Sequence, residues 1–212
     1  MALTQVIFDN TIFNYILKIQ SVDFNILLRS IISDKILIPI QIIPEMESLA
    51  NNEPQFRTRI LKWIDQVNRK SFFHICASYD SIIFDTIKRK LDEGEAGAIA
   101  QAEKRGVYWF LSDDIKNIKF IKQNYGNIHQ HSFFFLISLA DILGLLPDYE
   151  SVLIDFLEIS RYNNRTENKK RNFKKHLRDE YIAALQMSGL HFNKKVVSQK
   201  TSISKILERK VS

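Results

Sequence analysis

The amino-acid sequence predicts an α/β fold in which a mostly parallel sheet is covered by helices on both faces. Short apolar runs at 6–8 and 107–111 end abruptly in polar and acidic residues, and each is followed by a helical pattern. Such alternation of strands with helices is typical of parallel sheets that are buried on both faces. We therefore expect a three-layer α/β/α domain over residues 1–160 and a basic, helical C-terminal extension over residues 161–212.

Hydrophobic periodicity and turn residues place the individual elements. Pro39 closes the second strand, and Gly106 ends the helix that precedes the third. Residues 72–76 and 126–129 are weaker candidates for a fourth and a fifth strand. In chain order, the clearer elements are a strand at 4–8, helices at 10–19 and 24–32, a strand at 36–38, helices from 42, at 54–69, at 78–90 and at 92–106, a strand at 107–111, a helix from 113, and helices at 132–146, 148–159 and 172–187.

The composition is that of a packed globular protein in a reducing compartment. Hydrophobic residues make up 45% of the 212 residues, and the single cysteine, Cys76, excludes an intramolecular disulfide framework and a cysteine-rich zinc site. The N-terminus lacks the basic segment of a signal peptide. The most apolar stretch, 129–146, is interrupted by Gln130, His131 and Asp141 and does not predict a membrane span. We expect a cytoplasmic protein that does not enter a membrane.

The net charge of +6 is unevenly distributed along the chain. Residues 1–160 carry 16 Lys and Arg against 20 Asp and Glu, a balance of −4, whereas residues 161–212 carry 14 against 4, a balance of +10. A basic tail on a mildly acidic body favours a polyanionic partner, either nucleic acid or an acidic protein surface. A solvated helical appendage and a contact with a second copy of the chain remain open as alternatives.

Aromatic residues are interleaved with the basic residues of this extension. Basic side chains neutralise phosphates, and aromatic rings stack on unpaired bases. Tyr162, Phe173 and Tyr181 are the aromatic candidates. The predicted nucleic-acid-binding residues are Arg171, Lys174, Lys175 and Arg178.

Acidic residues recur where predicted strands end or helices begin: Asp9, Glu45, Glu95 and the pair Asp113-Asp114. Each one alone is explained by helix capping or by the helix dipole. Together they predict a cluster, because the carboxyl ends of parallel strands share one edge of the sheet, where ligands bind. Clustered carboxylates repel one another, and a divalent cation removes that cost. Oxygen ligands suit Mg²⁺ or Mn²⁺, which can activate water and stabilise phosphoryl oxygens.

Four segments resemble the motifs of PIN domains, in particular those of bacterial PIN-like proteins whose central motif reads Leu-x-x-Gly-Glu-Ala-x-Ala-Ile. The resemblance covers about residues 4–146, and its most specific part is the second and third segments together. It implies a doubly wound α/β fold and metal-dependent cleavage of RNA, often by the toxin of a toxin–antitoxin pair. The segments are VIFDN at 6–10, IIPEM at 42–46, LDEGEAGAIAQA at 91–102 and LSDD at 111–114.

The resemblance also implies roles for individual residues. Asp9 matches the first acid of the family, Glu45 the second, Glu95 the third and Asp114 the acid of the final Thr-x-Asp-like motif. These four are the expected catalytic residues. Asp9, Glu95 and Asp114, with Asp113 as an additional ligand, are expected to bind the metal.

Three neighbouring residues complete the expected site. Ser112 stands where the final motif usually has threonine, and it can donate a hydrogen bond to a carboxylate or a substrate oxygen. Asn10 is expected to position water or phosphate. Glu93 lies outside the motif position and is expected to be an acid on the surface of the first helical turn.

The predicted function is therefore that of a metal-dependent endoribonuclease, with RNA as substrate and an antitoxin protein or a second copy of the chain as further partners. The alternative is a catalytically inactive PIN-like module that binds nucleic acid or protein. A phosphatase of the haloacid dehalogenase type would need a second Asp where Thr11 stands. The chain also lacks the glycine-rich loops that hold nucleotide phosphates.

Overall fold

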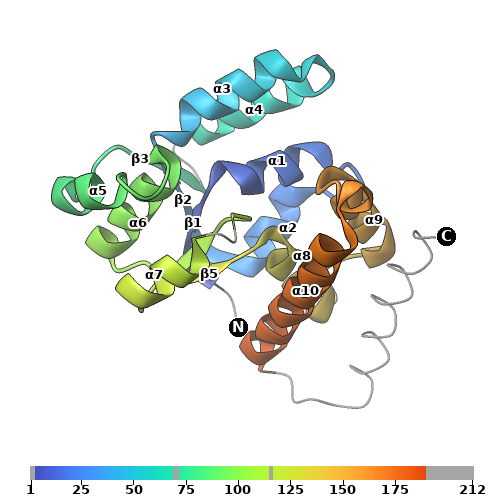
Figure 1. Ribbon diagram of the computed structural model, residues 1–212. Coiled ribbons are helices and arrows are strands. Elements are labelled where there is room, and N and C mark those ends of the chain that lie inside the picture. The colour runs from blue at the N-terminus through green and yellow to red at the C-terminus, as the bar shows by residue number, and fades with distance from the viewer. Residues whose placement is uncertain (1–2, 69–71, 115–116, 190–212) are drawn as a thin grey trace. The chain divides into compact units, whose positions relative to one another are not determined.

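The computed structural model describes residues 3–68, 72–114 and 117–189 (Figure 1). The contacts within the chain divide it into two compact units. The sheet unit contains residues 3–18 and 24–133, and the helical unit contains residues 19–23 and 134–189 of the described chain. This division falls at residue 133 rather than at the expected residue 160, because the helices that follow residue 133 pack with the C-terminal extension.

The sheet unit is built on a five-stranded parallel sheet with the order β3-β2-β1-β4-β5. The predicted fold class is confirmed, as is the weaker strand candidate at 72–76. The candidate at 126–129 is wrong in its bounds: residues 126–127 form a turn, and the fifth strand shares only His129 with it. The strand order reverses direction between β1 and β4, which are hydrogen-bonded to each other through Val6–Phe8 and Trp109–Leu111. The strands are β1 (Leu3–Phe8), β2 (Ile32–Pro39), β3 (Phe73–Cys76), β4 (Trp109–Leu111) and β5 (His129–His131).

Helices cover both faces of this sheet, and Figure 1 shows α1 and α2 on one side and α5, α6 and α7 on the other. In the described chain, the helices that connect the five strands are α1 (Asn10–Lys18), α2 (Phe24–Ile31), α3 (Ile42–Asn52), α4 (Arg57–Asn68), α5 (Ser81–Ile87), α6 (Glu93–Arg105) and α7 (Ile118–Asn124), with a 3₁₀ turn at Pro54–Phe56.

The small residues of α6 let this helix pack closely on the sheet. Ala96, Ala98 and Ala100 are fully buried, and α6 contacts β1, β2 and β4. Their neighbours in the core include Ile7 of β1 and Phe110 of β4. As predicted, α6 ends at a glycine: Gly106 has a φ of 64°, and its N–H binds the carbonyl oxygens of the last turn.

The predicted start of the helix at residue 113 is wrong. Asp113 and Asp114 are not helical, residues 115–116 lie outside the described chain, and α7 begins at Ile118. The hydroxyl and amide contacts of the loop after β4, which are described below, hold this backbone outside a helical conformation.

The helical unit contains α8 (Phe133–Ile142, whose first residue belongs to the sheet unit), α9 (Tyr149–Ile159), a 3₁₀ turn at Tyr162–Asn164 and α10 (Glu167–Ser188). Its core is aromatic: the ring centroids of Phe134 and Phe156 are 5.6 Å apart, and Phe173 lies 6.1 Å from Phe156 and 5.7 Å from Tyr162. The described helices include none that is long and apolar enough to cross a membrane.

Candidate active site

Asp9 lies directly after β1, at the edge where the strand order reverses. Its backbone N–H donates to the carbonyl of Leu111 at 2.9 Å, which joins the ends of β1 and β4. Its carboxylate is buried, and Oδ2 accepts hydrogen bonds from Thr11 Oγ1 at 2.8 Å and from Ser112 Oγ at 3.0 Å. Burial raises the pKa of Asp9, the hydroxyls lower it, and the charge of Asp92 raises it further.

The loop after β4 fixes the direction of these two hydroxyl groups. Thr11 Oγ1 accepts from the backbone N–H of Asp113 at 3.0 Å, and Ser112 Oγ accepts from that of Asp114 at 3.2 Å. Each hydroxyl therefore receives one hydrogen bond from the backbone and gives its own proton to Asp9. The predicted supporting role of Ser112 agrees with this geometry, and Thr11 is a partner that the sequence analysis missed.

Glu95 lies in the first turn of α6 and is 1% exposed. Its Oε2 accepts from Asn117 Nδ2 at 2.6 Å, while Oε1 is buried and has no hydrogen-bond partner in the described part of the chain. Burial raises the pKa of Glu95 to about 8, and the charges of Asp92, Asp9 and Asp114 contribute to this rise. A buried carboxylate oxygen without a partner is costly, so this atom indicates a position for a bound cation or proton.

Side-chain oxygens from three elements converge at Gly94. A Cβ atom added to this glycine would lie 3.3 Å from Glu45 Oε1, 3.4 Å from Asp92 Oδ1 and 3.7 Å from Asp9 Oδ1. The missing side chain of Gly94 thus leaves room between the carboxylates. The pKa of Glu45 is raised by partial burial of its carboxylate, then by the charge of Asp9, and lowered by a hydrogen bond with the side chain of Asn10.

Asp92 is the acid of this group that the sequence analysis missed. Its Oδ1 accepts from the backbone N–H of Glu95 at 2.9 Å and caps α6. An Asp three residues before a Glu at the start of a helix is a capping pattern that could have revealed its position. Asn117 had no such signal, because its contact with Glu95 joins residues that are 22 positions apart.

The two acids after β4 have different surroundings. Asp113 Oδ1 accepts from the backbone N–H of Phe133 at 2.6 Å, so this carboxylate anchors the segment that follows β5. Asp114 is half-buried, its carbonyl accepts from Gln130 Nε2 at 3.0 Å, and its charge acts on Glu95. The structure therefore brings Asp114 to the carboxylate cluster and gives Asp113 a structural contact. Glu93 is exposed, as expected.

The cluster is acidic without a complete set of metal ligands. Among the residues that the structure describes, no group of three or more His, Cys, Asp or Glu side chains is arranged to hold one metal ion. The chemistry of the donors nevertheless fits a hard divalent cation, since all are carboxylate oxygens. The pKa values of Asp9, Glu45 and Glu95 are raised, and Glu95 Oε1 has no hydrogen-bond partner among the described residues.

Comparisons of the chain with models of protein families, with curated proteins and with solved structures found no match. The geometry and chemistry of the carboxylate cluster are thus the basis for a functional proposal.

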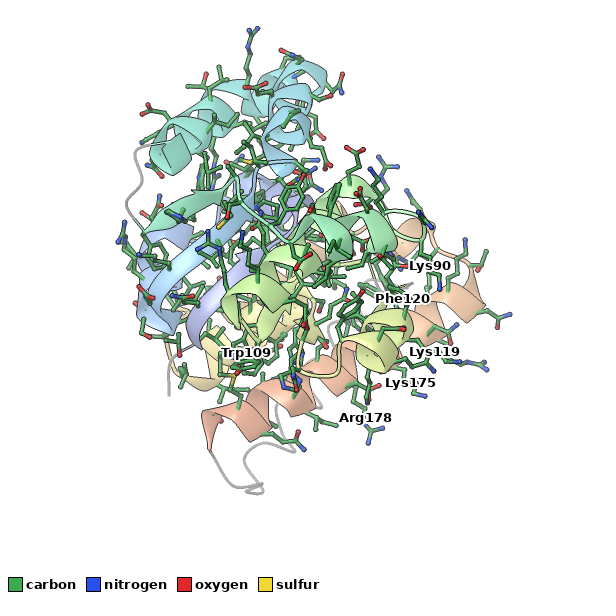
Figure 2. All side chains as sticks on the ribbon, turned by 90° about the vertical axis from the view of Figure 1, so that its left-hand side faces the viewer. Lys90, Trp109, Lys119, Phe120, Lys175 and Arg178 are labelled. Atoms are coloured by element: carbon green, nitrogen blue, oxygen red, sulfur yellow. The ribbon has the colours of Figure 1, made fainter. Side chains whose placement is uncertain are left out.

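The basic residues predicted to bind nucleic acid lie on one face of α10. They occur at helical spacings of three, four and seven residues, all four are exposed, and Figure 2 shows Lys175 and Arg178 projecting outward from the helix. The predicted aromatic partners are not available to stack on bases, because Tyr162, Phe173 and Tyr181 are buried. Apolar packing explains this correction, since Phe173 and Tyr162 belong to the aromatic core described above. The exposed basic residues are Arg171, Lys174, Lys175 and Arg178.

Proposed function

We propose that the sheet unit hydrolyses RNA phosphodiester bonds with the help of a divalent cation, in the manner of a PIN domain. The observation that carries this proposal is the convergence of Asp9, Glu45 and Asp92 oxygens at Gly94, together with Glu95 Oε1, a buried oxygen that has no hydrogen-bond partner among the described residues. The position of the cluster at the reversal of strand order, where open α/β sheets bind ligands, supports it.

Asp9, Glu45, Glu95 and Asp114 would hold Mg²⁺ or Mn²⁺ in this proposal. Such a cation, when bound, activates water and stabilises the charge on phosphoryl oxygens during an in-line displacement. The protein positions its ligands in advance: Thr11 and Ser112 hold Asp9 Oδ2, so Oδ1 is left to face Gly94.

Two further contacts support the same arrangement. Asn117 holds Glu95 Oε2 and leaves Oε1 without a partner among the described residues. The side chain of Asn10 binds Glu45, which orients a carboxylate that is otherwise exposed. Substituting either amide would therefore disturb the ligands without removing a carboxylate.

The test is cleavage of mixed RNAs by the pure full-length protein with Mn²⁺ or Mg²⁺ and with a chelator. We expect cleavage that stops in chelator and falls at least 100-fold in Asp9→Asn or Glu45→Gln, because metal-assisted catalysis supplies several kcal/mol. Glu47→Gln is the matched control, since Glu47 is an exposed acid on the same helix as Glu45. Cleavage that persists in chelator or in Asp9→Asn would refute the mechanism.

A catalytically inactive PIN-like module is the second candidate, and the absence of a three-ligand group among the described residues favours it. The two candidates differ in what happens when Mn²⁺ is added. For a hydrolase, Mn²⁺ should raise the unfolding temperature, and Asp9→Asn should abolish this rise. An inactive module should bind RNA but leave it uncleaved in Mn²⁺. Growth arrest on expression, relieved by a co-expressed protein partner, would extend the first candidate to a toxin that acts in the cytoplasm.

A further inference from the structure

A lysine and an aromatic ring meet on the surface of the sheet unit, between the turn after α5 and helix α7. Lys90 Nζ lies 5.1 Å from the centroid of the Phe120 ring. Phe120 is half-buried and packs edge-to-face on Tyr125, with centroids 6.2 Å apart. Figure 2 shows Lys90, Phe120 and Lys119 together. The cation–π contact favours this position of the exposed lysine head group.

Basic residues lie around this contact, together with the acids Asp85 and Glu93, whose charges act on Lys88. Lys88 is paired with Asp85 at 3.0 Å, but the remaining cations form no ion pair with another described residue. We call them, together with Phe120, the Lys90 surface; they are exposed and come from two segments of the chain. The cations of the Lys90 surface are Arg89, Lys90, Lys119 and Lys122.

Both segments of the Lys90 surface adjoin the carboxylate cluster along the chain, one before Asp92 and the other after Asn117. Asp92, whose Oδ1 lies at Gly94, follows Lys90 by two residues, a span of at most about 7 Å. Asn117, which binds Glu95, precedes Phe120 by three residues, a rise of about 5 Å along a helix. The Lys90 surface is therefore a direct continuation of the site on both of its chain segments.

An RNA substrate needs such a surface. The acids at Gly94 repel a phosphate backbone, whereas lysine and arginine side chains beside them attract it and release its counterions. We infer that the Lys90 surface binds the phosphate backbone of single-stranded RNA next to the carboxylate cluster. This inference rests on the proposed function in taking RNA as the substrate. The contacts are to phosphates, so binding is independent of base sequence.

The experiment measures binding of a fluorescein-labelled single-stranded RNA of about 12 nucleotides to the full-length protein in chelator, where metal-dependent cleavage is blocked. The test variant is Lys90→Gln/Lys119→Gln. The control is Lys35→Gln/Lys62→Gln, which removes the same charge from exposed positions elsewhere in the sheet unit. A Lys90→Arg/Lys119→Arg variant keeps the charge.

We expect the test variant to bind roughly 10-fold more weakly at moderate salt and to lower the slope of log affinity against log salt by about 1.4, because each lost phosphate contact on a single strand contributes about 0.7. The control should change affinity less than about 2-fold, and the arginine variant should bind like the wild type. Equal unfolding temperatures of all variants establish that the fold is intact.

Equal losses in the test and control variants, unchanged binding in the test variant, or no binding by the wild type at low salt would each overturn the inference. Its failure is distinct from failure of the proposed function. If RNA binding depends on Lys90 and Lys119 but the protein does not cleave RNA in Mn²⁺, the proposed hydrolase function is refuted and the inferred binding surface is supported. If the wild type cleaves RNA but the test variant binds it with unchanged affinity, the binding surface is refuted and the hydrolase function is supported.

Discussion

Replacing Glu95 by glutamine tests how much the buried carboxylate lowers the free energy of unfolding of the metal-free protein. The side chain is 1% exposed, and its pKa is raised from 4.5 to about 8 by burial and then by the charges of Asp92, Asp9 and Asp114. Since one pH unit corresponds to about 1.4 kcal/mol, the rise corresponds to at most about 5 kcal/mol. Solvent screening and structural relaxation reduce this energy, so we expect the ionised Glu95 side chain to lower the free energy of unfolding by about 2 to 3 kcal/mol.

The sign follows from the protons bound in each state. Between pH 4.5 and about 8 the folded protein keeps a proton on Glu95 that the unfolded chain releases. The free energy of unfolding therefore falls as the pH rises through this window and is highest at its acidic end. Glutamine resembles the protonated acid, and its carbonyl can still accept from Asn117. Glu95→Gln should match the wild type near about pH 5 and exceed its stability by about 2 to 3 kcal/mol near about pH 8.5.

Urea unfolding in chelator at these two pH values measures the difference, and Glu47→Gln is the control for loss of an acid. The pH dependence that remains in Glu95→Gln reports on Asp9 and Glu45, whose pKa values are also raised. If Glu95→Gln loses as much stability as the wild type between the two pH values, then Glu95 is not held in its protonated form and the reasoning is refuted.

Two further predictions concern other positions. A Cβ on Gly97 would lie 2.7 Å from Gln41 Oε1 and 2.9 Å from Gln41 Cδ, so Gly97→Val should destabilise the protein by about 1 to 3 kcal/mol in urea unfolding, whereas Gly97→Ala should cost less because of its helix propensity. Unchanged stability in Gly97→Val would contradict this contact. Burial raises the pKa of Asp141 to about 6. Asp141→Asn should therefore stabilise the protein by roughly 1 kcal/mol above about pH 6 and have no effect near about pH 4. Thermal unfolding of the variant and the wild type at the two pH values measures this difference.

The sequence predicts those parts of the fold that depend on local patterns. The apolar run before Asp9 and the small residues of α6 each carry their own signal, and both elements occur as expected. The short strands β3 and β5 have four and three residues, too few for their periodicity to identify them clearly, so only their approximate positions could be predicted.

The site was predictable in its acids but not in their partners. Asp9 follows a recognisable strand and Glu95 lies in the first turn of a recognisable helix, whereas the hydrogen bond from Ser112 to Asp9 joins residues 103 positions apart. Asp113 shows the same limit, because the hydrogen bond from the backbone N–H of Phe133 to Asp113 Oδ1 joins residues 20 positions apart. The direction of each of two adjacent acidic side chains depends on the backbone conformation of the loop, and a loop has no regular periodicity from which this direction could be predicted.

The central place of β1 in the sheet determines when the site can form during protein synthesis. The ribosome makes β1 first, but one of its two hydrogen-bonding edges is filled only by Trp109–Leu111. Asp9 then still needs the hydroxyl of Ser112, and Glu95 needs the amide of Asn117. A nascent chain that has not yet released these residues lacks the assembled cluster.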